Sequence, residues 1–150
     1  SDLQLESEAV KKEQTGKITI HADFIRDVMT QNSLSEAFDI IGNVRIKDIW
    51  FEKMQNSLSY GSPLSALIVE KQLIVSEKMS LWDIFKLEMI LTGQFVRNRE
   101  FPEGVRAKLV EKDNNPKWTF KKIEEVDPGV VDSFFKPPWE VNPLDKLIAI

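Results

Sequence analysis

The side chains that could carry out chemistry are few in this sequence, and the single histidine, His21, is the most versatile of them. A Ser–His–Asp triad could use only His21, and a histidine-rich metal site is excluded by count. The absence of cysteine excludes a disulfide, a thiolate-bound zinc, an iron–sulfur cluster and a cysteine nucleophile. We therefore predict a surface or helix-capping role for His21 and no metal site.

Acidic pairs such as Glu124 with Glu125, or Glu70 with Glu77, are compatible with general acid/base catalysis. Carboxylates at this density more often form a solvated face, so catalysis is the less favoured interpretation. The six glycines are scattered and form neither of the glycine-rich phosphate-binding motifs. We expect no nucleotide site of that kind.

The basic cluster lies near the end of a predicted helix and consists of Lys108, Lys112, Lys117, Lys121 and Lys122. Because acidic residues at 111 and 113 interrupt it, the cluster indicates an anionic partner only weakly, and a solvated helix end is favoured. The net charge of −4 argues against general affinity for nucleic acid or anionic lipid. No apolar run approaches the roughly 18 residues that span a bilayer, so we expect no membrane partner.

The elements that must position these side chains are predicted to be helices. Ser33, Ser62 and Ser80 are typical helix caps, and each precedes apolar residues at helical spacing. The pattern predicts a first short helix ending near residue 29 and further helices over about 34–43, 45–55, 63–75, 80–96 and 102–113. Gly42-Asn43 is expected to end the second of these in the left-handed region. Alternating runs are no longer than residues 17–20, so the predicted fold class is all-α.

The length of 150 residues, with 42% hydrophobic and 29% charged side chains, fits a soluble single domain. We predict a linker or frayed helix over residues 1–16, a helical domain over 17–113 and an extended C-terminal arm over 114–150. The arm is rich in proline, and we expect its aromatic residues to pin it to the domain: Trp118, Phe120, Phe134, Phe135 and Trp139. Because the first residue is not Met, we expect a trimmed chain or a fragment.

The most specific motif is Phe-Pro-Glu-Gly-Val-Arg-Ala at residues 101–107, followed by Leu109, Lys112-Asp113 and Pro116-Lys117-Trp118. Upstream lie Ser-Pro-Leu-Ser at 62–65, Lys-Gln-Leu at 71–73, and Ser80-Leu81 with Glu88 and Leu91. In these motifs the chain resembles the C-terminal part of the 3-hydroxyisobutyryl-CoA hydrolases, a branch of the crotonase (enoyl-CoA hydratase) superfamily. A weaker resemblance reaches back to about Leu34.

The resemblance implies a C-terminal helical domain without its catalytic core. The family's β/α core, its glycine-rich oxyanion loops and its catalytic Glu and Asp all precede the matching segment, so no catalytic residue is carried over. Where the family usually has Tyr-Arg after the glutamate that matches Glu88, this chain has Met89-Ile90. The family positions that are matched, and for which we expect a structural role, are Glu103, Gly104 and Arg106.

The resemblance also implies a contact with coenzyme A. In the wider superfamily a basic residue at this helix end lies near the CoA nucleotide phosphate, and Lys112, or else Lys108, is the candidate here. CoA is part of the substrate, so no cofactor is expected. The implied partners are the crotonase core of the same protein and further copies in a homo-oligomer, and the implied location is the mitochondrion.

Three functions from different classes remain open. The first is the C-terminal domain of a 3-hydroxyisobutyryl-CoA hydrolase of valine breakdown, which covers the core, supports assembly and is inert alone. The second is a structural protein of the mitochondrial small ribosomal subunit, because fungal members of this family occur there and the Pro/aromatic tail suits a docking arm. The third is a stand-alone helical adaptor unrelated to CoA.

Overall fold

The computed structural model describes residues 16–147, and these divide into two compact units with the boundary between residues 58 and 59. This division differs from the single helical domain predicted over 17–113. The described residues form helices and no strands, which confirms the all-α prediction for this part of the chain. None of the described helices is both long enough and apolar enough to cross a bilayer. The predicted linker over residues 1–16 lies outside the described residues, apart from Gly16.

The first unit contains α2 (Lys17–Ile20), α3 (Ala22–Met29), α4 (Leu34–Asn43) and most of α5 (Ile49–Tyr60). Its centre is the buried Phe51, whose ring meets those of His21 and Phe24 edge to face, with centroids 4.7 and 4.9 Å apart. His21 also stacks on Trp50 at 5.0 Å, and its side chain caps no helix. The predicted surface or capping role of His21 is therefore wrong, because ring packing holds this side chain inside the unit.

Asp48 caps the start of α5, which the sequence did not reveal. One carboxylate oxygen accepts the backbone N–H of Trp50 at 2.8 Å, and the other pairs with Lys17 Nζ at 2.7 Å. These bonds hold the pKa of Asp48 below its ordinary value, and the bond from Lys17 has the largest effect. Because the cap is Asp48, α5 begins at Ile49 instead of near residue 45, and it continues past the polar residues that were expected to end it.

The predicted left-handed end of α4 is also wrong. The helix includes Gly42 and Asn43, and its C-cap is Val44, whose backbone is extended at φ −62° and ψ 136°. The side-chain amide of Gln55 donates to the carbonyls of Ile41 and Val44 at 2.8 and 3.0 Å. These bonds satisfy the end of the helix without a left-handed residue.

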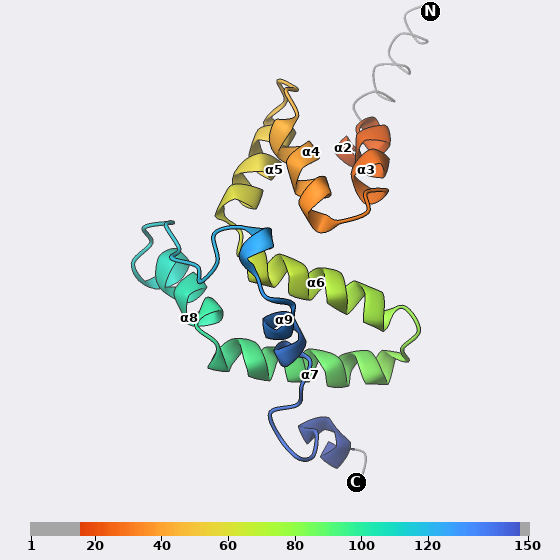
Figure 1. The fold of residues 1–150 in the computed structure, drawn as a ribbon, viewed down its shortest axis with the longest axis vertical. Helices are drawn as coiled ribbons and strands as arrows, with labels where there is room; N and C mark the ends of the chain where they lie inside the picture. Colours follow the sequence, from red (N-terminus) through yellow and green to blue (C-terminus); the bar gives the residue numbers. More distant parts are fainter. Residues whose placement is uncertain (1–15, 148–150) are drawn as a thin grey trace, which may run out of the picture. The chain divides into compact units, whose positions relative to one another are not determined.

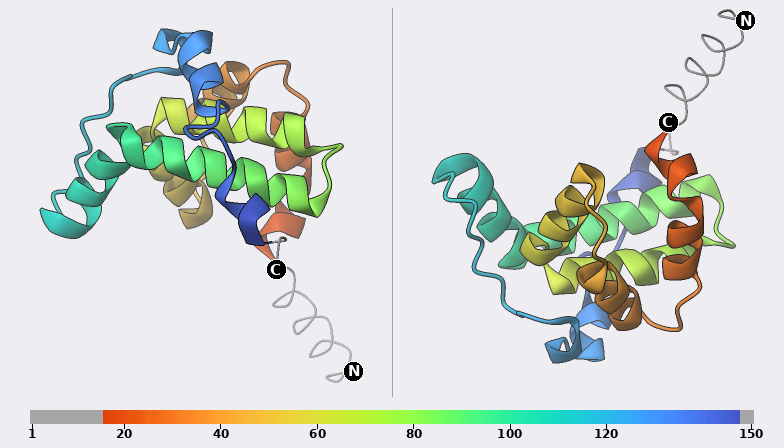
Figure 2. Two further views of the ribbon diagram at one scale, coloured as in Figure 1. Left: turned by 90° about the horizontal axis from the view of Figure 1, so that it is seen from below. Right: turned by 90° about the horizontal axis from the view of Figure 1, so that it is seen from above.

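The second unit is built on two long helices, α6 (Pro63–Ser76) and α7 (Leu81–Arg97). Figures 1 and 2 show that they run in opposite directions and are joined by a short turn. The helix α9 (Pro128–Phe134) packs against both, and α8 (Glu100–Val105) follows α7. Ser62 and Ser80 accept backbone N–H groups three residues later at 3.1 and 3.2 Å, which confirms two predicted caps.

The core of the second unit draws on α6, α7 and α9, and its buried members are Leu64, Ile68, Leu87, Leu91, Val126, Val131 and Phe134. Val131 and Phe134 belong to the segment that was predicted to be an extended arm. That prediction needs correction, because Asp127 caps α9 and Pro128 opens it in the middle of the arm. Two short 3₁₀ helices, Ile123–Glu125 and Pro143–Leu147, flank it.

The helix predicted over 102–113 consists of two different elements. α8 starts at Glu100, before Pro102, and passes directly into a π-helical turn, η1 (Arg106–Val110). Here the backbone N–H of Glu111 bonds the carbonyl of Arg106 at 2.8 Å, which is the i→i+5 spacing of a π turn. Leu109 and Val110 are exposed on this turn.

Truncation of the core should test the packing of the second unit. Leu91 is 5% exposed, whereas Leu81 on the same helix is 69% exposed. We expect Leu91→Ala to lower the free energy of unfolding by about 2–5 kcal/mol. Leu81→Ala, the matched control, should change it by less than about 0.5 kcal/mol. Chemical denaturation measures both, and equal effects of the two substitutions would contradict this core assignment.

Candidate functional site

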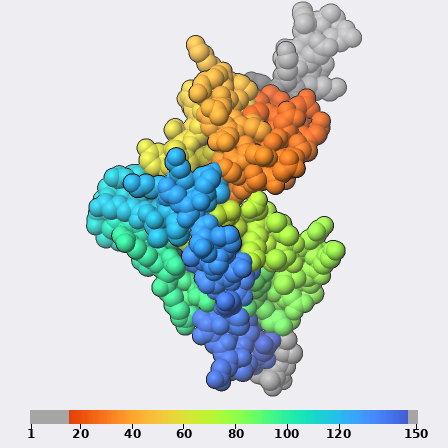
Figure 3. Space-filling view, viewed as in Figure 1, coloured from red at the N-terminus to blue at the C-terminus, as the bar shows by residue number. Residues whose placement is uncertain are grey.

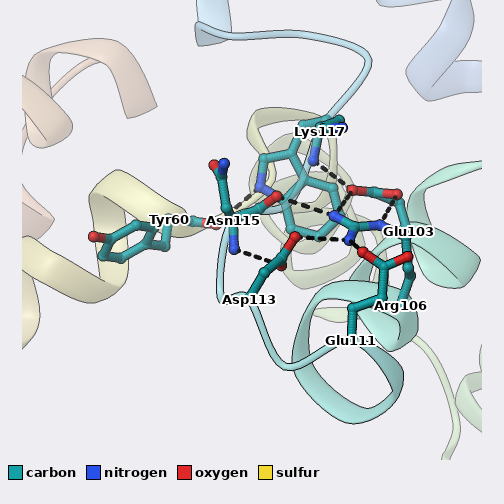
Figure 4. Close-up of polar contacts among 8 residues, drawn as sticks. Tyr60, Glu103, Arg106, Glu111, Asp113, Asn115 and Lys117 are labelled. Carbon is teal, nitrogen blue, oxygen red and sulfur yellow. Dashed lines mark hydrogen bonds and ion pairs between the residues drawn. The ribbon is translucent and has the colours of Figure 1, made fainter.

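The motif at residues 101–118 folds into an ion-pair cluster that we call the clasp, formed by Glu103, Arg106, Glu111, Asp113, Asn115 and Lys117 (Figure 4). Arg106 donates from Nε and Nη2 to the two carboxylate oxygens of Glu103 at 2.9 and 2.7 Å. Its Nη1 donates to Glu111 and, at 2.8 Å, to Asp113. Three carboxylates thus surround one guanidinium, so Arg106 is not available to bind an external phosphate.

Glu103 is the buried member of the clasp, with 8% of its surface exposed. Besides Arg106, it accepts the backbone N–H of Lys117 at 2.6 Å. The hydrogen bonds from Arg106 and from Lys117 lower the pKa of Glu103 from its ordinary value of 4.5 to about 2, although burial acts in the opposite direction. The same bond to Glu103 raises the pKa of Arg106. The partners of this pair among the described residues lie within the second unit.

Glu100 is a second buried carboxylate, 2% exposed, which the sequence analysis missed. One oxygen accepts the hydroxyl of Ser62, which also caps α6, and the other accepts the backbone N–H of Thr119 at 2.9 Å. The sequence contains one signal for this pair, the three-residue spacing between Glu100 and Glu103, which places both carboxylates on one side of a helical turn. That spacing alone does not distinguish a buried pair from a solvated one.

Trp118 lies between the backbone groups that bind these two carboxylates. Its indole Nε1 donates to the carbonyl of Tyr60 at 2.8 Å, and its ring lies against Gly104. A Cβ at Gly104 would come within 3.2 Å of the ring, so this position favours glycine because of a close approach. Gly104, for which a structural role was predicted, thus forms part of the surface on which the ring of Trp118 packs.

The structure places the two candidate CoA contacts, Lys108 and Lys112, differently. Lys108 lines an open groove of about 510 Å³, whose other lining residues are Ser65, Phe95, Glu100, Phe101, Gly104, Val105, Leu109 and Trp118. Lys112 follows η1, has a left-handed backbone with φ 57°, and is not among the lining residues. The neighbouring acids at 111 and 113 bind Arg106 and not these lysines.

The groove is suited to binding an apolar or aromatic group whose anionic end reaches Lys108. It offers no nucleophile with an adjacent base, since both oxygens of Glu100 are already bonded to Ser62 and Thr119. The described residues also contain no cluster of His, Asp and Glu that could hold a metal ion. The arrangement supports binding more than bond cleavage.

The sequence model of the enoyl-CoA hydratase/isomerase family matches residues 3–135. The chain belongs to this family. The match extends on both sides of the motifs between residues 34 and 118 and ends before the last part of the chain. It therefore confirms the resemblance read from the motifs and lengthens it.

Several relatives are named as mitochondrial 3-hydroxyisobutyryl-CoA hydrolases. Those of Gallus gallus and Dictyostelium discoideum are 34% and 33% identical over 118 and 114 residues, which cover 78% and 75% of the chain. The protein of Homo sapiens is 31% identical over 117 residues, or 77% of the chain. The matched segment is about 30% of the length of each of these relatives.

A solved structure shares the fold. The crystal structure of an enoyl-CoA hydratase from Rhodobacter sphaeroides matches 83% of the chain with a TM-score of 0.71 and 22% sequence identity. The matched part is 36% of that protein. The fold described here is thus one part of a larger protein in this relative as well.

Acid titration should test the clasp. Because folding lowers the pKa of Glu103 from 4.5 to about 2, the native state binds fewer protons than the unfolded state between these values. The stability that the charged form contributes is complete above pH 4.5 and is lost as the pH falls toward 2. We therefore expect Glu103→Gln to destabilise the chain at pH 6 and to approach wild-type stability near pH 2.5, as measured by urea unfolding. For the control Glu77→Gln, at an exposed position, we expect only a small change in stability at pH 6.

Proposed function

We propose that this chain is the C-terminal helical part of a mitochondrial 3-hydroxyisobutyryl-CoA hydrolase-like protein, and that it covers the catalytic core formed by the remainder of that protein. The observation that carries the proposal is the identity of 31–34% to mitochondrial hydrolases of this name over about 30% of their length. Covering the core and supporting assembly would then be the contribution of these helices to hydrolysis of the thioester.

The apolar surface of α7 supports this proposal. Leu81, Phe85 and Val96 are all exposed, and their spacing places them on one face of the helix. This face is different from the one that carries the buried Leu87 and Leu91. An apolar face of this kind is typical of a helix that covers another layer of a larger protein.

The chemistry of the groove agrees with a supporting role. Hydrolysis of a thioester requires hydrogen-bond donors placed where the oxyanion develops, together with an acid or base beside the carbonyl. The polar side chains that line the groove, Ser65, Glu100 and Lys108, do not form such an arrangement, because Glu100 is bonded to the chain itself. We infer that the catalytic groups belong to the part of the protein outside this chain.

A chimeric enzyme tests this function. The segment of the Gallus gallus hydrolase that matches this chain would be replaced by the chain, and release of CoA from 3-hydroxyisobutyryl-CoA would be measured. We expect hydrolysis by the chimera and none by the chain alone. Phe85→Asp should reduce hydrolysis by the chimera because it places a charge in the proposed contact, whereas Lys78→Asp, at an exposed polar position, should not.

Two results would contradict the proposal. Release of CoA by the 150-residue chain alone would show that it carries its own catalytic groups. An inactive chimera, together with cosedimentation of the protein with mitochondrial small ribosomal subunits, would favour the structural role in the ribosome.

Binding of CoA should depend on the same assembly. Exposed lysine contacts contribute about 0–1 kcal/mol each, whereas a dissociation constant of 1 mM requires roughly 4 kcal/mol. We therefore expect calorimetry to show that free CoA binds the isolated chain more weakly than about 1 mM. In the chimera, Lys108→Glu and Lys112→Glu should weaken binding, and Lys121→Glu serves as the control from the same basic cluster. Micromolar binding by the isolated chain would contradict a dependent domain, and an unchanged affinity in either variant would remove that lysine from the site.

A further inference from the structure

The segment that follows the family match lies across α7. The match ends at residue 135, and the described chain continues to residue 147. Figure 1 shows this dark-blue segment passing from α9 across α7, and Figure 3 shows its atoms lying over the green α7 on that side of the molecule. We call residues 136–146 the strap.

The strap is anchored by an aromatic ring on a glycine. Gly93 lies inside α7, where glycine normally weakens a helix, so the position calls for a packing reason. A Cβ at Gly93 would lie 2.8 Å from Cζ3 and 3.0 Å from Cη2 of Trp139, closer than side chains can approach. The indole Nε1 of Trp139 is buried without a hydrogen-bond partner. Packing of the ring on the helix backbone at Gly93 therefore holds Trp139 in place, and the indole N–H contributes no hydrogen bond.

Polar contacts fix the strap on both sides of this anchor. Before it, the amide of Gln94 donates to the carbonyl of Lys136 at 2.6 Å. After it, the amide of Asn142 donates to the carbonyl of Lys86 at 3.1 Å, and the ammonium of Lys86 lies 3.7 Å from the carboxylate of Asp145. The strap thus contacts α7 at two points, Gln94 and Lys86, which are about two helical turns apart.

The strap covers the face of α7 that carries Lys86 and Gly93. Lys86 and Gly93 are seven residues apart and share one face, and the half-buried Met89 and Ile90 lie between them on that face. Apolar side chains suit a surface that a Pro/aromatic segment covers, because covering them removes apolar area from water.

We infer that the strap closes the Met89/Ile90 face of α7 through the Trp139–Gly93 anchor. A partner could reach this face only by displacing the strap. The exposed stripe formed by Leu81, Phe85 and Val96 is then the face of α7 that is left for contact with another layer. The inference does not depend on the proposed hydrolase role.

Amide hydrogen exchange on the full chain tests the anchor. In the strap, the N–H groups of Leu144 and Asp145 donate to Asn142 at 3.0 Å each, so their exchange reports whether the strap is docked. We expect both amides to exchange at least about tenfold faster in Gly93→Ala and in Trp139→Ala, whereas core amides in α6 and α9 keep their rates. Gly42→Ala is the matched control, because no atom lies within 4 Å of a Cβ at that helical glycine.

The double variant separates a direct contact from two independent effects. If the new methyl group acts only by displacing the indole, Gly93→Ala should have no further effect on the strap amides once Trp139 is alanine. Unchanged exchange at Leu144 and Asp145 in either single variant would overturn the inference. Equal acceleration of the amides in α6 and α9 would also overturn it, because Trp139 would then belong to the folding core and not to a separate strap.

Discussion

The buried carboxylate of Glu103 and the guanidinium of Arg106, one helical turn apart, hold together the region that carries the family motif. A buried charge without a partner would be costly, and the bidentate pairing with Arg106 offsets that cost for Glu103. Because Arg106 also binds the acids at 111 and 113, the pair dictates how the chain turns back after η1. Two residues of this turn, Lys112 and Asn114, have left-handed backbones with φ of 57° and 50°, an uncommon conformation for residues other than glycine. The clasp maintains this turn.

The clasp also shapes the groove. Glu100 and Glu103 bind the backbone N–H groups of Thr119 and Lys117, so the returning chain is fixed on both sides of Trp118. The indole is thereby placed against Gly104 and lines the same groove as Lys108. The residues of the motif therefore act together. The buried carboxylates accept backbone N–H groups and so position the ring of Trp118, and Lys108 lines the same apolar groove.

The helix α7 carries the surface on which the proposed role within a larger protein depends. One face contributes Leu87 and Leu91 to the core, a second lies under the strap, and a third carries exposed apolar residues. Helices in independent domains normally leave such a face polar, because apolar area in water is unfavourable. The match to about 30% of the length of the hydrolases agrees with this proposal, since the rest of such a protein could cover the third face.

The sequence by itself determined the helical class, the helix starts at Ser62 and Ser80, and the family, because caps, helical spacing and a gapless motif are local properties. It could not show the roles of His21, Glu100 and Gly93. An imidazole stacked on Trp50, a carboxylate bonded to Thr119 and a glycine under Trp139 each depend on a partner that the fold brings from 19 or more residues away. The same limit explains the errors at α4 and in the predicted arm. Gln55 ends α4 from a later helix, and α9 is kept in place by burial of Val131 and Phe134 against α6 and α7. Local propensity is encoded in neighbouring residues, whereas burial and pairing are decided only when distant segments meet.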